Sequence, residues 1–158
     1  MIKLVASDLD GTLLHNYQQT VPKEIYDTIK ALHEKGIIFT AASGRQYANI
    51  RRLFAPLGFD IPYIAENGSM CVYKEEILAT GLTPSKTIRH ILDALMEYRK
   101  IYHTGHCILS VKDTYYSDST DERFIDYMEN DMHNIVTYVP DLYAICLLYT
   151  SDAADDGE

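Results

Sequence analysis

The stretch Ile2–Leu14, IKLVASDLDGTLL, decides how the rest of the chain is interpreted. Its first half, residues 2–6, is a short β-prone apolar run of the kind found in buried strands. Asp8 and Asp10 follow, and Gly11 then permits an abrupt reversal of the chain. Residues two apart in an extended chain lie on the same side, so the two carboxylates come close together. Two like charges so close are costly unless a cation or a proton lies between them.

These two aspartates predict a site for a hard metal ion with oxygen ligands. Asp and Gly are also common turn residues, so an ordinary loop is the alternative reading of the D-x-D-G string. An EF-hand calcium loop is excluded, because counting from Asp8 puts Leu13 where glycine is needed and Gln19 where glutamate is needed. A P-loop is excluded, because the chain contains no G-x-x-x-x-G-K-[ST] sequence.

After this stretch the pattern alternates between helix and strand. Thr20 and Pro22 are helix start signals, and apolar residues recur at helical spacing until Gly36. A buried apolar strand is then expected at 37–42, followed by a helix and a third strand at 61–65. Strand, helix and strand within about forty residues form a βαβ unit.

Polar or glycine residues follow each of these three expected strands. They are Asp8 and Asp10 after the first, Ser43-Gly44-Arg45 after the second and Glu66-Asn67-Gly68 after the third. Ligands of open parallel sheets bind at the carboxyl edge of the strands. The coincidence predicts a ligand site at that edge.

The pattern changes near residue 82. A hairpin at 70–82 is expected to lead out of the core, and Thr83-Pro84 opens another helix. The expected elements after that helix are a strand at 107–111, a turn at 112–114, a strand at 115–116, a helix at 120–129 and a β-prone run at 135–139. Hairpins in place of crossovers predict an α+β second part.

The composition excludes several classes of protein. The chain has 158 residues, 47% of them hydrophobic, and a formal net charge of −9. It shows no clustered Lys and Arg surface of the kind that binds nucleic acid. It also shows no long apolar run and no signal peptide, so we expect no membrane partner and a cytoplasmic protein. Three cysteines without a C-x-x-C spacing argue against a disulfide framework and for a reducing compartment.

The stretch Ser7–Leu14, SDLDGTLL, resembles the first motif, D-x-D-G-T-L, of the haloacid-dehalogenase-like phosphohydrolases. The segments Ala42-Ser43-Gly44-Arg45 and Ala65-Glu66-Asn67-Gly68 are similar to the companion segments of the Cof-type branch, which carries a C2 cap domain between its second and third motifs. The resemblance implies an α/β fold: an incomplete Rossmann-like parallel-sheet core over 1–82 and part of an α+β cap domain over 83–145.

The resemblance also implies a reaction, the magnesium-dependent hydrolysis of a small phosphate ester. Asp8 is the expected nucleophile, which forms an aspartyl-phosphate, and Asp10 is the expected general acid and base. Mg²⁺ is expected between the Asp8 carboxylate and the backbone carbonyl of Asp10. The expected substrate is a sugar phosphate or a phosphorylated cofactor, although the sequence does not say which.

Five further residues are expected to bind the phosphate or the substrate: Thr12, Ser43, Gly44, Arg45 and Asn67. The Thr12 hydroxyl is expected to order the turn, and Ser43 with the Gly44 N–H to donate to phosphoryl oxygens. Arg45 either reaches the substrate or pairs with an acid on the surface. Asn67 lies either at the edge of the site or in a tight Asn-Gly turn.

The family's two later motifs, a lysine and an acidic G-D-x-x-N-D-type segment, do not occur in this chain. We therefore expect an N-terminal fragment that is inactive alone, with the outer edge of its first strand unpaired. The alternatives are a phosphomutase or phosphotransferase of the same superfamily, and a non-catalytic binding module with the same fold. The sequence leaves the oligomeric state open.

The tail, residues 146–158, fits neither part. Its string CLLYTSDAAD resembles the translation of a synthetic sequencing adapter, and four of its last seven residues are acidic. A non-native tail and a natural disordered terminus are the two interpretations.

Overall fold

The computed structural model describes residues 1–15, 18–111 and 114–148, and the side chains up to residue 146. The chain divides into two compact units, each described by itself below. The first is Met1–Leu82 with Met132–Asn134, and the second is Thr83–Asp131 with the chain from Ile135 onward. The turn expected at 112–114 lies partly outside the described residues, and so does most of the tail.

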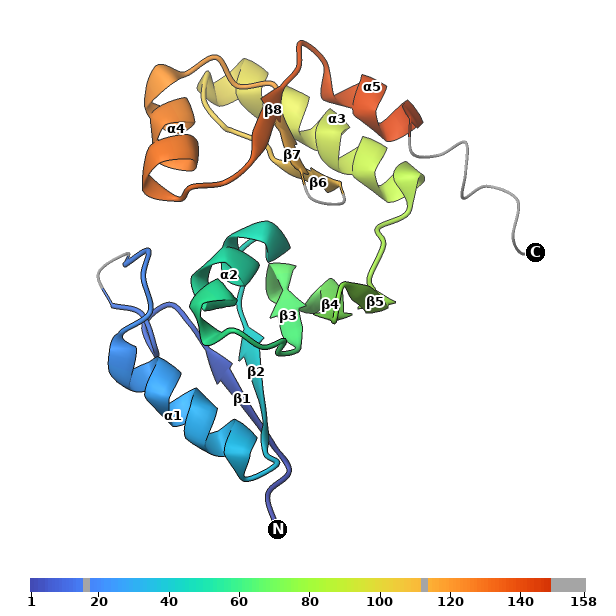
Figure 1. The fold of residues 1–158 in the computed structure, drawn as a ribbon. Helices are drawn as coiled ribbons and strands as arrows, with labels where there is room; N and C mark the ends of the chain where they lie inside the picture. Colours follow the sequence, from blue (N-terminus) through green and yellow to red (C-terminus); the bar gives the residue numbers. More distant parts are fainter. Residues whose placement is uncertain (16–17, 112–113, 149–158) are drawn as a thin grey trace, which may run out of the picture. The chain divides into compact units, whose positions relative to one another are not determined.

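The first unit is built on a five-stranded sheet in the order β1-β2-β3-β4-β5 (Figure 1). Its strands are β1 (Leu4–Asp8), β2 (Ile38–Ala42), β3 (Tyr63–Ala65), β4 (Met70–Tyr73) and β5 (Glu76–Thr80). Strands β1, β2 and β3 are parallel, whereas β4 and β5 are antiparallel to their neighbours. The prediction of an α/β fold with a parallel-sheet core is confirmed.

The sequence suggests that the hairpin of β4 and β5 leads out of the core. In the structure it stays in the core sheet. It extends that sheet, because β4 pairs with β3 through Ala65↔Met70 and Tyr63↔Val72. Val72 is buried, whereas every residue of β5 is exposed. The hairpin thus belongs to the sheet through β4 and forms its outer border through β5.

Two helices connect the parallel strands: α1 (Lys23–Glu34) and α2 (Tyr47–Phe54), which continues as the short 3₁₀ turn η1 (Ala55–Leu57). The Tyr26 hydroxyl on α1 donates a 2.6 Å hydrogen bond to the carbonyl of Leu53 on α2. Both helices also contribute to one buried apolar cluster. They therefore cover the same face of the sheet.

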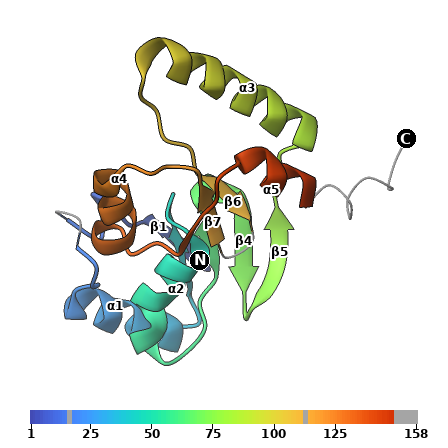
Figure 2. The ribbon, with the colours of Figure 1, turned by 90° about the horizontal axis from the view of Figure 1, so that it is seen from above.

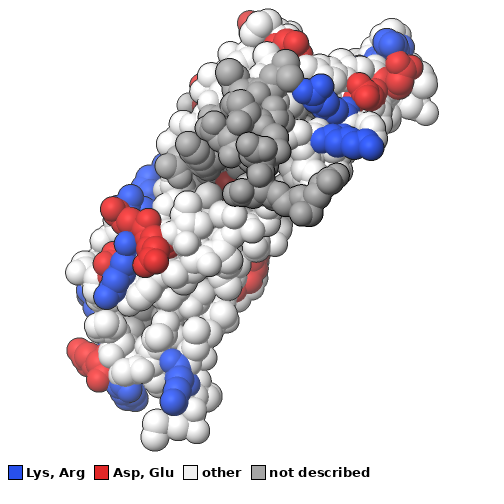
Figure 3. Space-filling model, turned by 90° about the vertical axis from the view of Figure 1, so that its right-hand side faces the viewer, with Lys and Arg blue, Asp and Glu red and all other residues white. Residues whose placement is uncertain are grey.

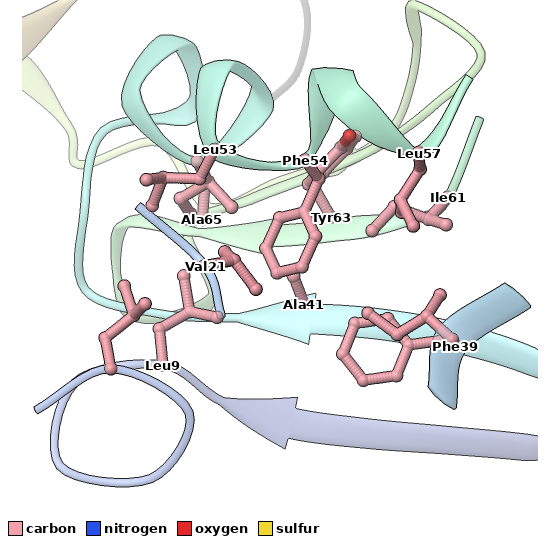
Figure 4. Close-up of a cluster of buried hydrophobic side chains, with 13 residues drawn as sticks. Leu9, Val21, Phe39, Ala41, Leu53, Phe54, Leu57, Ile61, Tyr63 and Ala65 are labelled. Atoms are coloured by element: carbon pink, nitrogen blue, oxygen red, sulfur yellow. The ribbon is translucent and has the colours of Figure 1, made fainter. Parts of the chain in front are cut away.

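The core of this unit lies between those helices and the sheet. Figure 4 shows Phe54 of α2 standing over the sheet next to Tyr63 of β3, with Phe39 of β2 nearby. The ring of Phe54 packs 5.9 Å from that of Phe39 and 6.5 Å from that of Tyr63, measured between ring centres. Burial of these aromatic rings supplies much of the favourable free energy that holds the helices on the sheet.

Strand β1 lies at one end of the sheet, and β2 is its only neighbour among the described strands. The expected unpaired edge is thus present. Apolar side chains beside it are exposed, Leu4 by 53% and Ile38 by 48%. Strand β2 is therefore not buried along its whole length: Ile38 is exposed, whereas Phe39, Thr40 and Ala41 are buried.

The second unit is a three-stranded sheet packed against two helices. Its elements are α3 (Ser85–Tyr102), β6 (Leu109–Val111), β7 (Thr114–Ser117), α4 (Glu122–Asp126) with a π-helical turn (Tyr127–Asp131), β8 (Val136–Tyr138) and α5 (Leu142–Leu148). Figure 2 shows α3 and α5 side by side above the sheet. Leu92 of α3 meets Leu142 and Cys146 of α5 in the core of this unit.

Two expectations for the second unit are wrong. Strand β8 runs parallel to β7, so the chain returns through a crossover that contains α4, where a hairpin was expected. Helix α5 was not expected at all, and it includes Cys146, which the sequence placed in the tail. Cys146 is only 5% exposed, because its side chain packs on α3.

The surface shows no dominant charge on the face drawn in Figure 3. Basic and acidic side chains lie there in small groups of both signs, and most of that face is uncharged. Among the helices that are described, none has the length and hydropathy needed to cross a membrane. The cysteines at 71, 107 and 146 are all free thiols.

A partly buried ion pair joins α3 to the end of β7. The Arg99 guanidinium donates two hydrogen bonds of 2.5 and 2.8 Å to the Asp118 carboxylate. Its Nε also donates to the carbonyl of Gly105 at 2.9 Å. These hydrogen bonds from Arg99 lower the pKa of Asp118 below the ordinary carboxyl value. The folded state therefore stabilises the ionised form of Asp118 relative to the protonated form.

Replacing Asp118 should cost stability in a way that depends on pH. The stabilisation is present above the ordinary Asp pKa of about 3.9 and is lost as the pH falls through the lowered pKa of the folded chain. We expect Asp118→Asn to lower the free energy of unfolding by about 2 kcal/mol at pH 7, because it breaks a charge-assisted pair. The difference from the parent chain should shrink below about pH 4.

Urea unfolding at pH 7 and pH 3 measures both quantities. Glu97→Gln is the matched control, because Glu97 pairs with Lys100 on α3 and both side chains are about 70% exposed. It should change the free energy of unfolding by less than about 0.5 kcal/mol at either pH. A pH-independent loss in Asp118→Asn would contradict the role given to its charge.

Candidate functional site

The register of the parallel strands brings the expected site residues to one edge of the first unit. Asp8, the last residue of β1, lies opposite Ala42, the last residue of β2. Ala42 in turn lies opposite Ile64 of β3, and the Ser43 N–H donates to the Ile64 carbonyl at 2.9 Å. Neighbouring strands lie about 4.8 Å apart, so the segments that follow them are close together.

The loop after β1 is closed by hydrogen bonds to its own backbone. The N–H groups of Thr12, Leu13 and Leu14 all donate to the carbonyl of Leu9, at 3.2, 2.9 and 2.8 Å. Gly11 adopts a φ of +84°, which favours glycine. The tight loop is anchored by Leu9, which is fully buried, and it leaves Asp8 and Asp10 exposed.

The Thr12 hydroxyl donates a 3.3 Å hydrogen bond to Oδ2 of Asp8. It thus connects the end of the loop back to the end of β1. This contact fits the sequence-based expectation that the Thr12 hydroxyl orders the turn. It also limits the directions in which the Asp8 carboxylate can move.

Arg45 makes the strongest contact between the two loops. Its Nε donates to Oδ2 of Asp10 at 2.8 Å and its Nη2 donates to Oδ1 at 2.6 Å. The arginine side chain is 3% exposed and that of Asp10 is 47% exposed. The pair therefore lies with its cation inside the protein and its anion at the surface. The sequence had suggested an acid on the surface as one of two partners for Arg45.

The turn after β2 leaves two hydrogen-bond donors unused within the described part of the chain. The Ser43 oxygen accepts a 3.1 Å hydrogen bond from the Arg45 N–H, which fixes the hydroxyl in place. No protein acceptor for the Ser43 hydroxyl or for the Gly44 N–H is found among the described residues. Ser43 is 7% exposed, so this hydroxyl has little access to solvent.

The third loop packs directly on the second. The Asn67 N–H donates to the Ser43 carbonyl at 3.2 Å, and the Glu66 N–H donates to the Arg45 carbonyl at 3.1 Å. A Cβ atom on Gly44 would lie 2.9 Å from Oδ1 of Asn67, closer than such atoms approach. A side chain at position 44 would therefore force the Asn67 side chain to shift.

Glu66 and Asn67 both have left-handed backbones, with φ values of 51° and 56°. Such conformations cost free energy in residues other than glycine and persist where surrounding contacts hold them. The contacts to Ser43 and Arg45 do so here. Oε1 of Glu66 is buried and has no hydrogen-bond partner among the described residues.

Oxygen donors for a magnesium ion are present at the end of β1 in the form of Asp8 and the Asp10 backbone. Within residues 1–15, 18–111 and 114–148, no group of three or more His, Cys, Asp or Glu side chains could hold a metal ion. The chemistry of the donors thus fits Mg²⁺, which keeps several water ligands, but the described chain supplies only part of its coordination shell.

The sequence predicted seven candidate site residues, and the structure connects them in pairs: Thr12 with Asp8, Arg45 with Asp10 and with Ser43, and Asn67 with Ser43 and Gly44. The sequence-based prediction missed Gln19 and Asn49, whose side-chain oxygens accept from Nη1 of Arg45 at 2.9 and 3.3 Å. Asn49 is 3% exposed on α2, and a polar residue within an apolar helical face is the signal that could have identified it.

The fold and this edge define a Rossmann-like α/β protein with an acidic loop and a set of hydrogen-bond donors at the carboxyl ends of its parallel strands. Residues 5–148 match the model of the haloacid dehalogenase-like hydrolase family. The chain belongs to this family. The match extends to the end of α5, three residues beyond the expected limit of the native chain at 145.

Relatives and solved structures agree with this assignment. The chain is 39% identical over 77 residues to phosphoglycolate phosphatase 1 of Saccharolobus solfataricus, covering 48% of this chain and 34% of the relative. It is 27% identical over 95 residues to 5-amino-6-(5-phospho-D-ribitylamino)uracil phosphatase of Escherichia coli, covering 60% and 35%. A crystal structure from Eubacterium rectale superposes with a TM-score of 0.73 at 25% identity, covering 90% of this chain and 52% of that one.

The chain thus spans about a third of these two relatives in the matched segments and about half of the solved structure. The sequence-based resemblance to this family is confirmed. The roles of the individual site residues stay predictions.

Substituting Gly44 tests the packing of the second and third loops. We expect Gly44→Ala to lower the free energy of unfolding by about 1–3 kcal/mol, because the added methyl group collides with the Asn67 amide. The loss should be smaller when Asn67→Gly is combined with it, since that change removes the colliding atoms and suits the positive φ. Urea unfolding of the single and double variants gives the coupling free energy.

Gly81→Ala is the matched control, because the nearest atom to its added Cβ would be 3.7 Å away. It should leave stability nearly unchanged. Strict additivity of the two changes at 44 and 67 would show that the Asn67 side chain does not cover Gly44.

Proposed function

We propose that this chain is the N-terminal part of a magnesium-dependent phosphatase that acts on a small phosphorylated metabolite. The observation that carries the proposal is the position of Asp8 at the end of β1 and of Asp10 in the loop after it, beside the Ser43–Gly44 turn after β2, with Arg45 joining the two loops. A nucleophile, an acid–base group and donors for the phosphoryl oxygens are thereby assembled at one sheet edge.

Asp8 serves as the nucleophile in this proposal. Its carboxylate attacks phosphorus in line with the leaving alkoxide, and an aspartyl-phosphate forms as the bond to the alcohol oxygen breaks. The Thr12 hydroxyl holds Oδ2 of Asp8, at 3.3 Å, which leaves Oδ1 for the attack. Restricting the carboxylate in this way lowers the entropic cost of reaching the reactive geometry.

Ser43 and Gly44 bind the phosphoryl group. During transfer, negative charge is spread over the equatorial oxygens, so donors aimed at them stabilise the transition state. The Ser43 hydroxyl and the Gly44 N–H are the donors that the described chain leaves unused at this edge. The Asn67 side chain packs against Gly44 and keeps that turn in place.

Asp10 moves the protons. As the carboxylic acid it gives a proton to the departing alcohol oxygen, and as the resulting carboxylate it takes one from the water that hydrolyses the aspartyl-phosphate, work usually worth about 10²–10⁴ in rate. Nearly half of its side chain is exposed, so a substrate and water can reach it.

Mg²⁺ would be held by the Asp8 carboxylate and the Asp10 backbone carbonyl. When bound, it screens the repulsion between the carboxylate and a dianionic phosphate ester. Because no group of three or more His, Cys, Asp or Glu side chains that could hold a metal ion lies together among the described residues, the remaining ligands would come from water or from residues outside the described part of the chain.

The substrate class is proposed from the relatives. The two relatives described above are named as phosphatases of phosphoglycolate and of a phosphorylated ribitylaminouracil, both small phosphate esters. The second unit, which lies at the position of the cap domain in the sequence, is where we expect selection of the leaving group.

The variant Asp8→Asn tests the proposal. It is made in the extended chain, which is the protein encoded when the reading frame is followed past Ile145 in the source DNA. We expect turnover of a chromogenic phosphate ester with Mg²⁺ by the extended chain, and a loss of at least about 10³-fold in Asp8→Asn, because the amide is no nucleophile. Steady-state rates with and without a chelator measure both dependences. The 158-residue chain itself should show no turnover above background.

Three outcomes would contradict parts of this account. Turnover by the 158-residue chain that disappears in Asp8→Asn would show that the later motifs are dispensable. An extended chain without turnover would favour a non-catalytic module. Transfer of the phosphoryl group to an added alcohol in preference to water would favour a phosphotransferase. Asp60→Asn is the control for a change of charge outside the site.

A further inference from the structure

The guanidinium of Arg45 has five N–H bonds, and each of them has an acceptor within the described chain. Nε and one N–H of Nη2 donate to Asp10, and Nη1 donates to Gln19 and Asn49. The remaining N–H of Nη2 faces the carbonyl of Gln18 at 3.5 Å. No donor is left over for a phosphate ester.

The position of Arg45 also keeps it from the solvent. The residue is 5% exposed, and its charge is balanced by the Asp10 carboxylate in a two-point contact. A phosphate group could reach the guanidinium only by displacing one of these four acceptors. Displacing Asp10 would separate a cation from its charged partner, which is unfavourable.

We infer that Arg45 is a positioning residue, which fixes the Asp10 carboxylate, and not a ligand of the phosphate. The inference rests on the proposed function, because Asp10 takes its acid–base role from there. Asn49, which is buried on α2, holds Nη1 and thereby aligns the plane of the guanidinium. Helix α2 in this way sets the direction of a carboxylate on the loop after β1.

The geometry leaves Asp10 free to act on a substrate. Arg45 contacts both carboxylate oxygens from one side, and each oxygen retains a second lone pair. The side chain is 47% exposed, so a substrate and water can reach part of it. A two-point contact fixes both the position and the plane of the carboxylate, which one contact with a lysine could not do.

The first test needs no activity and uses the ¹⁵N-labelled 158-residue chain. The Nε–H resonance of Arg45 should shift strongly in Asp10→Asn, while that of Arg51, which pairs with Glu75 on the surface, should stay in place. Adding inorganic phosphate with Mg²⁺ should move the backbone amide of Gly44 and leave the Arg45 Nε–H unmoved.

A phosphate-induced shift of the Arg45 Nε–H as large as that of the Gly44 amide would overturn the inference. The inference would also be overturned if the chemical shift of the Arg45 Nε–H did not change in Asp10→Asn. If phosphate moves neither signal, the proposed phosphate site fails, and the response to Asp10→Asn alone decides whether Arg45 holds Asp10.

The second test uses the extended chain and compares Arg45→Lys with Arg51→Lys. Lysine keeps the charge at 45 but loses the two-point contact, so we expect kcat to fall about 10- to 100-fold while KM changes less than about twofold. Arg51→Lys should change neither. Thermal unfolding of both variants separates a positioning role from a loss of fold.

A rise in KM with kcat intact would show that Arg45 binds the substrate and would overturn the inference. If the parent extended chain has no turnover that depends on Asp8, the proposed function fails instead, and the resonance of Arg45 decides the inference. The two failures are thereby distinguishable.

Discussion

The parallel hydrogen-bonded register of β1, β2 and β3 is the constraint on which the site depends. It places Asp8 opposite Ala42 and Ala42 opposite Ile64, so that the three loops leave the sheet at one edge. The register is held by helices that pack on one face of these strands, through aromatic rings such as Phe54. A slip by one residue would turn every side chain of a strand to the other face and separate the loops.

The sequence predicted much of this unit because its signals are local. Apolar runs marked the three parallel strands, and the residues after them marked the site. The contacts that depend on tertiary structure could not be predicted from the sequence. They are the approach of Asn67 to Gly44 and the hydrogen bonds from Arg45 to Gln19 and Asn49. Each joins residues whose spacing in the chain carries no periodic signal.

The second unit was predicted less well for a related reason. The strand at 136–138 was expected, but pairing direction depends on which neighbour it finds, and β8 joins β7 in parallel. Helix α5 is seven residues long and was obscured by its proximity to the acidic tail. Its apolar residues Leu142 and Cys146 are explained only by Leu92 on α3, which covers them.

The unpaired edge of β1 is consistent with the matched segments covering only about a third of the two relatives. Strand β1 pairs with β2 alone among the described strands, and Leu4 and Ile38 beside it are exposed by about half. Apolar side chains at an open sheet edge are a liability unless further chain covers them. Among the same described residues, no three His, Cys, Asp or Glu side chains lie together in a way that could hold a metal ion.

The central claim is that a divalent cation binds at the end of β1, and paramagnetic broadening by Mn²⁺ tests it most directly. Added to the ¹⁵N-labelled chain at substoichiometric levels, Mn²⁺ should broaden the amides from Asp8 to Thr12, with those of Ser43 and Gly44 next, and Asp8→Asn should abolish this effect. The account would be contradicted if those amides stayed sharp while others, such as those around Asp118 and Asp121, broadened, or if the pattern persisted in Asp8→Asn.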